Sequence, residues 1–239
     1  DWSSDVCSSD LPEKPDVAAA LKDYKGKAAM AEGEVFDPSP KNIESRLERY
    51  TLPSGLKVTL LTKKTRGNNV NATLRFPMGS AASLKDKGLI GGMVGGSLMR
   101  GTTSKNRQQI QDELSRLKAQ LNVSGTASAA SASIETTRES LPATLRLAGE
   151  LLKDSTIPES EFEQIRKSTI TALEAAKSDP QNIAPMRLQR ALYPYPKGDV
   201  RGTMLFDDQI EATKVAKVED ARAFYKAFYG ASNGHLAVV

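Results

Sequence analysis

Histidine, the side chain most often used to hold a catalytic zinc ion, occurs once in this chain, at His235. A catalytic zinc needs three protein ligands, and these nearly always include histidine. His235 lies in a short apolar stretch at the C-terminus, where an ordinary strand residue is expected. The only cysteine, Cys7, lies in an N-terminal stretch unlike the rest of the sequence. The sequence therefore predicts no complete zinc site built from this chain alone.

Serine nucleophiles are no better supported. The run at residues 95–99, Gly-Gly-Ser-Leu-Met, does not match the Gly-x-Ser-x-Gly elbow of serine hydrolases. Ser-x-x-Lys occurs at residues 54–57 and 115–118. Neither copy has the Ser-Asp-Asn and Lys-Thr-Gly partners that give this pattern catalytic meaning, so both are interpreted as chance occurrences.

The most informative stretch is the glycine-rich run at residues 88–102, Gly-Leu-Ile-Gly-Gly-Met-Val-Gly-Gly-Ser-Leu-Met-Arg-Gly-Thr. It resembles the metal-binding helix of the insulinase/pitrilysin family of zinc peptidases. In active members that helix carries His-x-x-Glu-His a few residues before a Gly-Thr pair. Counting back from Gly101, the three motif places fall on Gly92, Gly95 and Gly96. Since glycine can neither bind zinc nor accept a proton, the resemblance implies a helix without its chemistry.

The resemblance covers roughly residues 50–239. The stretch 50–58, Tyr-Thr-Leu-Pro-Ser-Gly-Leu-Lys-Val, is similar to the Leu-x-Asn-Gly-Leu-x-Val opening of these domains. Residues 71–79 resemble the strand before the motif helix, and residues 224–239 resemble the helix and strand that end a half-domain. The family's spacing places its third zinc ligand near Glu174. A lone carboxylate holds Zn²⁺ poorly, so we expect Glu174 to be a solvent-facing helical residue.

The resemblance implies an α+β fold in which an antiparallel sheet packs on helices, as in half-domains of the LuxS and mitochondrial processing peptidase type. The nearest likeness is to the second, non-catalytic half of long bacterial members. We expect this half-domain at residues 49–239, incomplete at its C-terminal end, after a linker at 12–48. The resemblance further implies that this chain binds no cofactor. Zinc would be held by an active half-domain of the same polypeptide or of a partner subunit, and peptides would be the substrates.

Local patterns predict the elements around the glycine-rich run. Alternating apolar residues indicate strands at 56–62 and 69–77. The glycines of residues 88–96 recur on one side of a helix. We expect that smooth side to let another backbone approach closely, with all three motif positions turned inward.

The segments after the glycine-rich run also carry clear periodicities. Ser104 is expected to cap a helix over residues 107–121, in which apolar residues step by three and four. Alternating small and polar residues predict one strand over 123–136. Further helices are expected at 138–153, 159–177, 186–192 and 218–229, followed by a strand at 235–239.

Composition sets wider limits. The chain is 39% hydrophobic and 26% charged, which is ordinary for a globular protein, and no apolar run reaches the length that spans a bilayer. Residues 1–11 resemble a translated sequencing adapter and are excluded from fold reasoning. Because they hold three aspartates and no Lys or Arg, the net charge of the remainder rises from +4 to +7. The basic residues are dispersed among acidic ones, which argues against nucleic-acid binding.

Three functions are left open. The first is a non-catalytic half-domain that forms chamber wall and positions peptides for proteolysis by a partner half. The second is a free-standing inactive subunit that binds peptides or assists assembly, and the third is an unrelated scaffold or nucleic-acid binder. The residues themselves name no compartment, whereas the export of many active relatives favours the periplasm.

Overall fold

A six-stranded sheet forms the centre of the computed structural model, which describes residues 32–231 and 233–239. The strand order is β1-β2-β6-β3-β5-β4, and every neighbouring pair is antiparallel except β2 with β6. The expected α+β class is therefore confirmed, with a mixed rather than purely antiparallel sheet. The strands are β1 (Leu47–Thr51), β2 (Lys57–Leu61), β3 (Asn69–Pro77), β4 (Gln120–Gly125), β5 (Ala129–Thr137) and β6 (His235–Val238).

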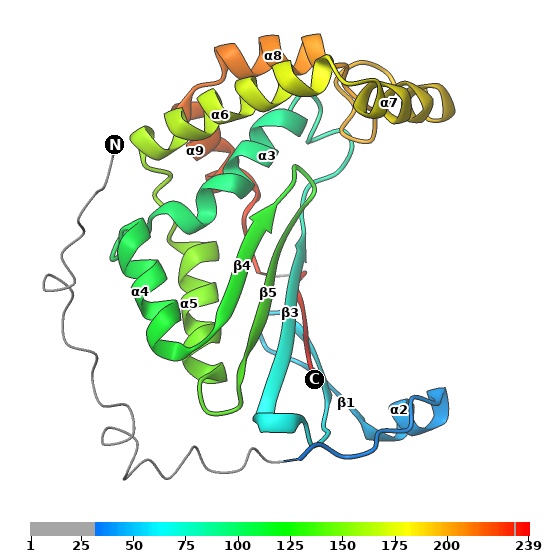
Figure 1. Cartoon of the computed structure of the whole chain (residues 1–239), viewed down its shortest axis with the longest axis vertical. Helices are drawn as coiled ribbons and strands as arrows, with labels where there is room; N and C mark the ends of the chain where they lie inside the picture. Colours follow the sequence, from blue (N-terminus) through cyan, green and yellow to red (C-terminus); the bar gives the residue numbers. More distant parts are fainter. Residues whose placement is uncertain (1–31, 232) are drawn as a thin grey trace, which may run out of the picture.

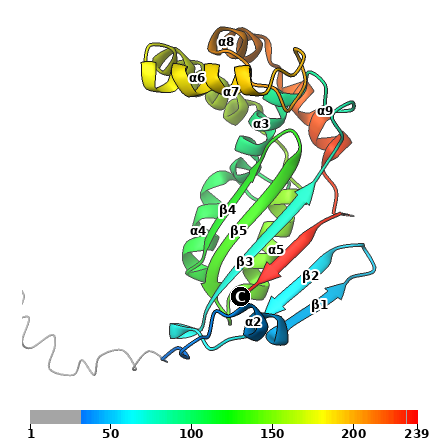
Figure 2. The same cartoon turned by 90° about the vertical axis from the view of Figure 1, so that its right-hand side faces the viewer.

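Helices cover one face of the sheet and cap one of its ends (Figure 1). The covering helices are α4 (Arg107–Leu117) and α5 (Leu141–Lys153), and α5 contacts β4 and β5. At the end of the sheet lie α3 (Gly88–Ser97), α6 (Glu159–Lys177), α8 (Phe206–Val215) and α9 (Val218–Phe228). Two helices, α2 (Pro40–Arg46) and α7 (Pro180–Leu192), project on the side that α4 and α5 leave uncovered (Figures 1 and 2).

The core lies between the sheet and its helices because side chains alternate along each strand. In β3, Ala72 and Leu74 are buried while their neighbours are exposed, and β5 buries Ala132 and Ile134 in the same way. The helices complete the core with residues such as Leu151, which is fully buried. Each buried leucine or isoleucine side chain contributes about 1.5–3 kcal/mol by leaving water, and each alanine contributes less.

The hairpin of β4 and β5 differs from two predictions. The helix expected over 107–121 ends at Leu117, because Lys118 adopts a left-handed conformation (φ 50°) and Leu121 already belongs to β4. The single strand expected at 123–136 is two antiparallel strands. The Thr126 hydroxyl accepts the backbone N–H groups of Ser128 (3.3 Å) and Ala129 (3.2 Å), and this local turn reverses the chain.

The starts of two helices differ from the predictions because other residues cap them. Asn106, rather than Ser104, caps α4, and its side chain and that of Gln109 accept each other's backbone N–H groups. Helix α7 begins at Pro180, well before the expected 186, because the Asp179 carboxylate accepts the N–H of Gln181. The sequence prediction did not include α8.

The segment expected as a linker, residues 12–48, contains helix α2, whose N-terminus is capped by Ser39. Its described part is tied to the sheet, because the N–H of Glu34 donates to the carbonyl of Lys64 (3.0 Å). The expectations for residues 1–11 and for the linker up to residue 31 lie outside the described residues.

Candidate functional site: the glycine helix and the open sheet face

One side of α3 lies directly against the tip of the β4–β5 hairpin. A Cβ atom on Gly95 would lie 2.5 Å from both the carbonyl carbon and the nitrogen of Gly125, and one on Gly91 would lie 2.8 Å from the nitrogen of Ala127. Such distances leave no room for a side chain, so this close approach of two backbones requires glycine. The predicted smooth packing side therefore exists, and Gly91 and Gly95 form it.

The other side of α3 is open. Gly92 and Gly96 are exposed; a Cβ on Gly92 would meet nothing within 4 Å, and one on Gly96 would meet only Ile165 Cδ1 at 3.8 Å. The expectation that all three motif positions turn inward is therefore wrong for these two. The reason is helical geometry, because residues one apart are rotated by about 100°. The positions that the resemblance assigns to the two histidines thus face outward, and the position it assigns to the glutamate is filled by the hairpin.

The third ligand position does not complete a site. Glu174 is exposed on α6. The pKa of Lys177 is raised mainly by its hydrogen bond to Asp207, and that of Lys214 by its hydrogen bond to Glu211, while the charge of Glu174 adds a smaller contribution to both. Glu174 lies nine residues, or about 13 Å of helix, beyond Ile165, the residue that faces Gly96. In the described part of the chain, no three His, Cys, Asp or Glu side chains gather where they could hold a metal ion.

A polar cluster holds the loop that follows α3, and no local pattern in the sequence predicts it. The Glu150 carboxylate on α5 accepts hydrogen bonds from Thr102 (2.7 Å), Ser104 (2.6 Å) and the Lys105 ammonium (2.6 Å). Burial alone would raise the pKa of Glu150, but these bonds and the Lys105 charge outweigh it and lower that pKa to about 2. The cluster is a structural anchor, because every member already has its partner.

Tyr229 packs against the tip of the β4–β5 hairpin at Gly125. The Tyr229 hydroxyl is buried and has no hydrogen-bond partner among the described residues, and a Cβ on Gly125 would lie 2.5 Å from it. Its ring stacks on Tyr225 with centroids 4.8 Å apart, and the Tyr225 hydroxyl donates to the carbonyl of Leu152 (2.9 Å). Burial raises the pKa of Tyr229, so this hydroxyl stays protonated and supplies no base at neutral pH.

Within residues 32–231 and 233–239, no helix covers the sheet face opposite α4 and α5, which faces the viewer in Figure 2. The surface of this face, called the floor below, is formed by the strand residues that alternate with the buried ones. These outward-pointing side chains are polar or small. Near the β4 edge the floor runs into a groove of about 840 Å³ between this face and α4. The exposed residues of the floor include Asn71, Thr73 and Arg75 of β3, Asn122 and Ser124 of β4, Ser133 and Glu135 of β5, and His235 and Ala237 of β6.

Two projecting elements frame this open face (Figure 1). At one end α7 buries none of its residues, and it presents Leu188 and Leu192 one helical turn apart, with exposures of 59% and 62%. Tyr193 follows directly and is 58% exposed. At the other end lie α2 and the edge strand β1. The open face is therefore the floor of a concave surface with an apolar rim at α7.

Solved structures with a similar fold identify this architecture. The chain matches the M16 peptidase inactive domain from Pseudomonas fluorescens with a TM-score of 0.65 at 18% identity, and a protease from Helicobacter pylori with 0.66 at 19%. The chain has the fold of an M16 peptidase domain. M16 is the insulinase/pitrilysin family, so the fold expected from the glycine-rich run is confirmed. No family model matches the sequence, and no curated protein does either.

The matches cover 81% of this chain but only part of each relative. The chain spans 46% of the Pseudomonas and Helicobacter structures and 22% of the ferredoxin protease FusC. That structure holds FusC in complex with Arabidopsis ferredoxin and matches with a TM-score of 0.64 at 18% identity. Within the described residues, no helix is both long and apolar enough to cross a membrane.

Proposed function

We propose that this chain is the non-catalytic half-domain of an M16-type zinc peptidase, and that its open sheet face positions peptides for cleavage by a partner half. The observation that carries the proposal is the pairing of an M16 fold with a motif helix that bears glycine at all three catalytic places. A half without ligands contributes to proteolysis by binding, orienting and enclosing the substrate.

The surface chemistry fits that role. The exposed side chains of the floor are polar or small and include no large apolar residue at the described positions, which suits an extended peptide above it. The apolar residues on the rim at α7 are exposed in the described part of the chain, and the chain spans less than half of the matched Pseudomonas and Helicobacter structures. Both features favour a second unit that closes over the floor. The active half would supply the zinc, and an exported, periplasmic protein belongs to the same proposal.

The test begins with the genomic reading frame upstream of residue 12. The proposal expects an in-frame domain with an intact His-x-x-Glu-His. That domain, produced separately, is assayed for hydrolysis of an internally quenched peptide with and without this chain. We expect the chain to raise the rate at least about tenfold by enclosing the substrate. An unchanged rate at saturating chain concentration would contradict the proposal.

The rim provides the matched variants for that assay. Leu188→Ser combined with Leu192→Ser on α7 should weaken the stimulation, because both side chains are exposed and available to a partner. Val215→Ser serves as the control, since Val215 is an equally exposed apolar residue (72%) at the end of α8. An equal loss of stimulation in the α7 double variant and in the Val215→Ser control would show that α7 does not contact the catalytic half.

The second candidate is a free-standing subunit that binds peptides without any catalytic partner. The same open floor favours it, because peptide binding needs no second half. A start codon near residue 12 and no catalytic domain in the reading frame would select this function over the first.

A further inference from the structure

Three basic or titratable side chains stand side by side on the open face. In the strand register Arg75 of β3 is opposite His235 of β6, and His235 is opposite Lys57 of β2. Adjacent strands lie about 4.8 Å apart, so the row spans about 10 Å across three strands. All three residues are exposed. Because register partners point to the same face, the side chains share the solvent above the floor.

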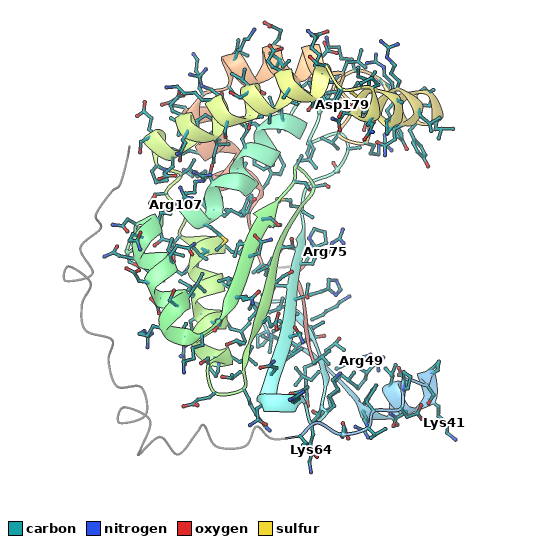
Figure 3. The ribbon with its side chains drawn as sticks, viewed as in Figure 1. Lys41, Arg49, Lys64, Arg75, Arg107 and Asp179 are labelled. Atoms are coloured by element: carbon teal, nitrogen blue, oxygen red, sulfur yellow. The ribbon has the colours of Figure 1, made fainter. Side chains whose placement is uncertain are left out.

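The row has no acidic partner in the described part of the chain. None of its members takes part in an ion pair, whereas the nearby Arg49 is bound by Glu44 at 2.8 Å. Among the described strand positions of the floor Glu135 is the one carboxylate, and it is in register with Asn71. Asn71 lies four residues from Arg75, about 13 Å along β3. Figure 3 shows Arg75 extending from β3 away from α4 and α5, into the open side.

Arg75 and Lys57 stand two strands apart, about 10 Å, with the His235 imidazole between them. In the strand register no carboxylate lies beside either charge, because Thr51 is the other neighbour of Lys57 and Ser131 is the other neighbour of Arg75. The positions next to the row are small and neutral: Ser131 lies opposite Arg75 on β5, and Ala237 follows on β6. A ligand above the floor would therefore reach both cations and the imidazole between them without displacing a bulky side chain.

We propose that the row formed by Arg75, His235 and Lys57 binds carboxylates of an acidic polypeptide segment that lies across the open sheet face. The identity of that segment as a substrate rests on the proposed function, while its acidity rests on the row itself. A peptide fits the dimensions, because side chains on one face of an extended strand repeat every 6.6–6.8 Å and two carboxylates then fall within the row.

A polypeptide fits better than a nucleic acid. Proteins that bind single strands combine a cationic groove with exposed aromatic side chains on which bases stack. The floor presents no aromatic side chain among its described exposed positions, and the row is too short to follow a phosphate backbone. Hydrogen-bonding side chains beside the row, Thr73 and Ser124, suit peptide groups.

The experiment measures binding of two fluorescent twelve-residue peptides to the full chain by anisotropy. One peptide carries alternating Glu residues, and the other has Gln at the same places. We expect the Glu peptide to bind at least about tenfold more tightly at low salt and to lose that advantage near 0.5 M NaCl, because salt screens exposed charges. Equal affinity of the two peptides at low salt would overturn the proposal.

Matched variants separate the row from general charge. Arg75→Gln with Lys57→Gln should remove most of the preference for the Glu peptide. Arg146→Gln with Lys153→Gln removes the same charge from α5, on the covered side of the sheet, and should leave the preference intact. Equal loss in both double variants would mean that net charge, not the row, attracts the peptide.

A competition assay decides between partner classes. Single-stranded oligothymidylate of the same charge should displace the Glu peptide poorly. Tighter, row-dependent binding of the oligonucleotide would overturn the peptide assignment. Failure of the chain to stimulate a catalytic half would refute the proposed function alone, because the preference for the Glu peptide is measured without that half.

Discussion

The two sides of α3 use the same amino acid for opposite reasons. Gly91 and Gly95 are required, since the backbone at Gly125 and Ala127 occupies the space where their side chains would be. Gly92 and Gly96 face open space, and nothing in the structure requires glycine there. The three positions that the resemblance assigns to the zinc motif therefore differ physically. The position assigned to the glutamate is closed by packing, whereas the two positions assigned to the histidines are open.

The largest effect is expected on the packed side. Gly95→Leu forces a side chain into the backbone of the hairpin tip and should lower the free energy of unfolding by about 3 kcal/mol or more. Chemical denaturation of Gly95→Leu beside Gly92→Leu measures the difference between the sides. Equal destabilisation by both substitutions would end the distinction.

The loop after α3 gives the next largest effect. Glu150→Gln removes the charge that holds Thr102, Ser104 and Lys105, and should cost about 1–2 kcal/mol after allowance for solvent screening. Because the folded pKa of Glu150 is about 2 against 4.5 as its ordinary value, this stability is present above pH 4.5. It should be lost between about pH 4.5 and pH 2. The free energies of unfolding of wild type and variant, measured by chemical denaturation, should therefore become equal as the pH falls from 4.5 to about 2. A difference that does not change with pH would refute the stabilising role of the Glu150 carboxylate.

Zinc ligands can be introduced on the exposed side of α3. Gly92→His with Gly96→His places two imidazoles one turn apart on an exposed helix face, where they should bind Zn²⁺. Zinc at ten times its dissociation constant would then stabilise the fold by about 1.4 kcal/mol. Thermal melts with and without Zn²⁺ measure it. Adding Gly95→Glu should cancel the gain by overpacking, and a triple variant as stable as the double would contradict the packed-side argument.

The smallest effect is a gain. Gly92→Ala should stabilise the protein by up to about 1 kcal/mol, because alanine favours an exposed helix and meets no neighbour. The matched Gly91→Ala should destabilise it, because its methyl group would press on Ala127. Urea denaturation measures the change in the free energy of unfolding for each variant. Changes of opposite sign support the difference between the two sides of α3, and changes of the same sign would contradict it.

Much of the fold was predictable because its signals are local. Alternation located β2 and β3, the leucines of α5 located that helix, and Pro158 with the apolar residues after it located α6. The β4–β5 turn was missed, since it depends on one threonine hydroxyl that competes with a continuous strand. The glycine spacing showed that α3 packs closely, but not which of its sides does so, because that depends on the distant hairpin.

The open face could not be predicted for a similar reason. Arg75, His235 and Lys57 are far apart in the sequence, and only the strand order brings them into one row. The single histidine therefore looked like an ordinary strand residue, and its position between two cations appears only in the register. The Glu150 cluster likewise joins a loop to a helix about 45 residues away.

We expect this chain to bind peptides without zinc and without cleaving them. Native mass spectrometry of the full chain with the Glu peptide and a slight excess of Zn²⁺ tests this expectation. We predict a complex of intact peptide with one chain, no stoichiometric zinc, and no peptide fragments after prolonged incubation. One tightly held zinc ion per chain, with fragments that disappear when a chelator is added, would contradict it.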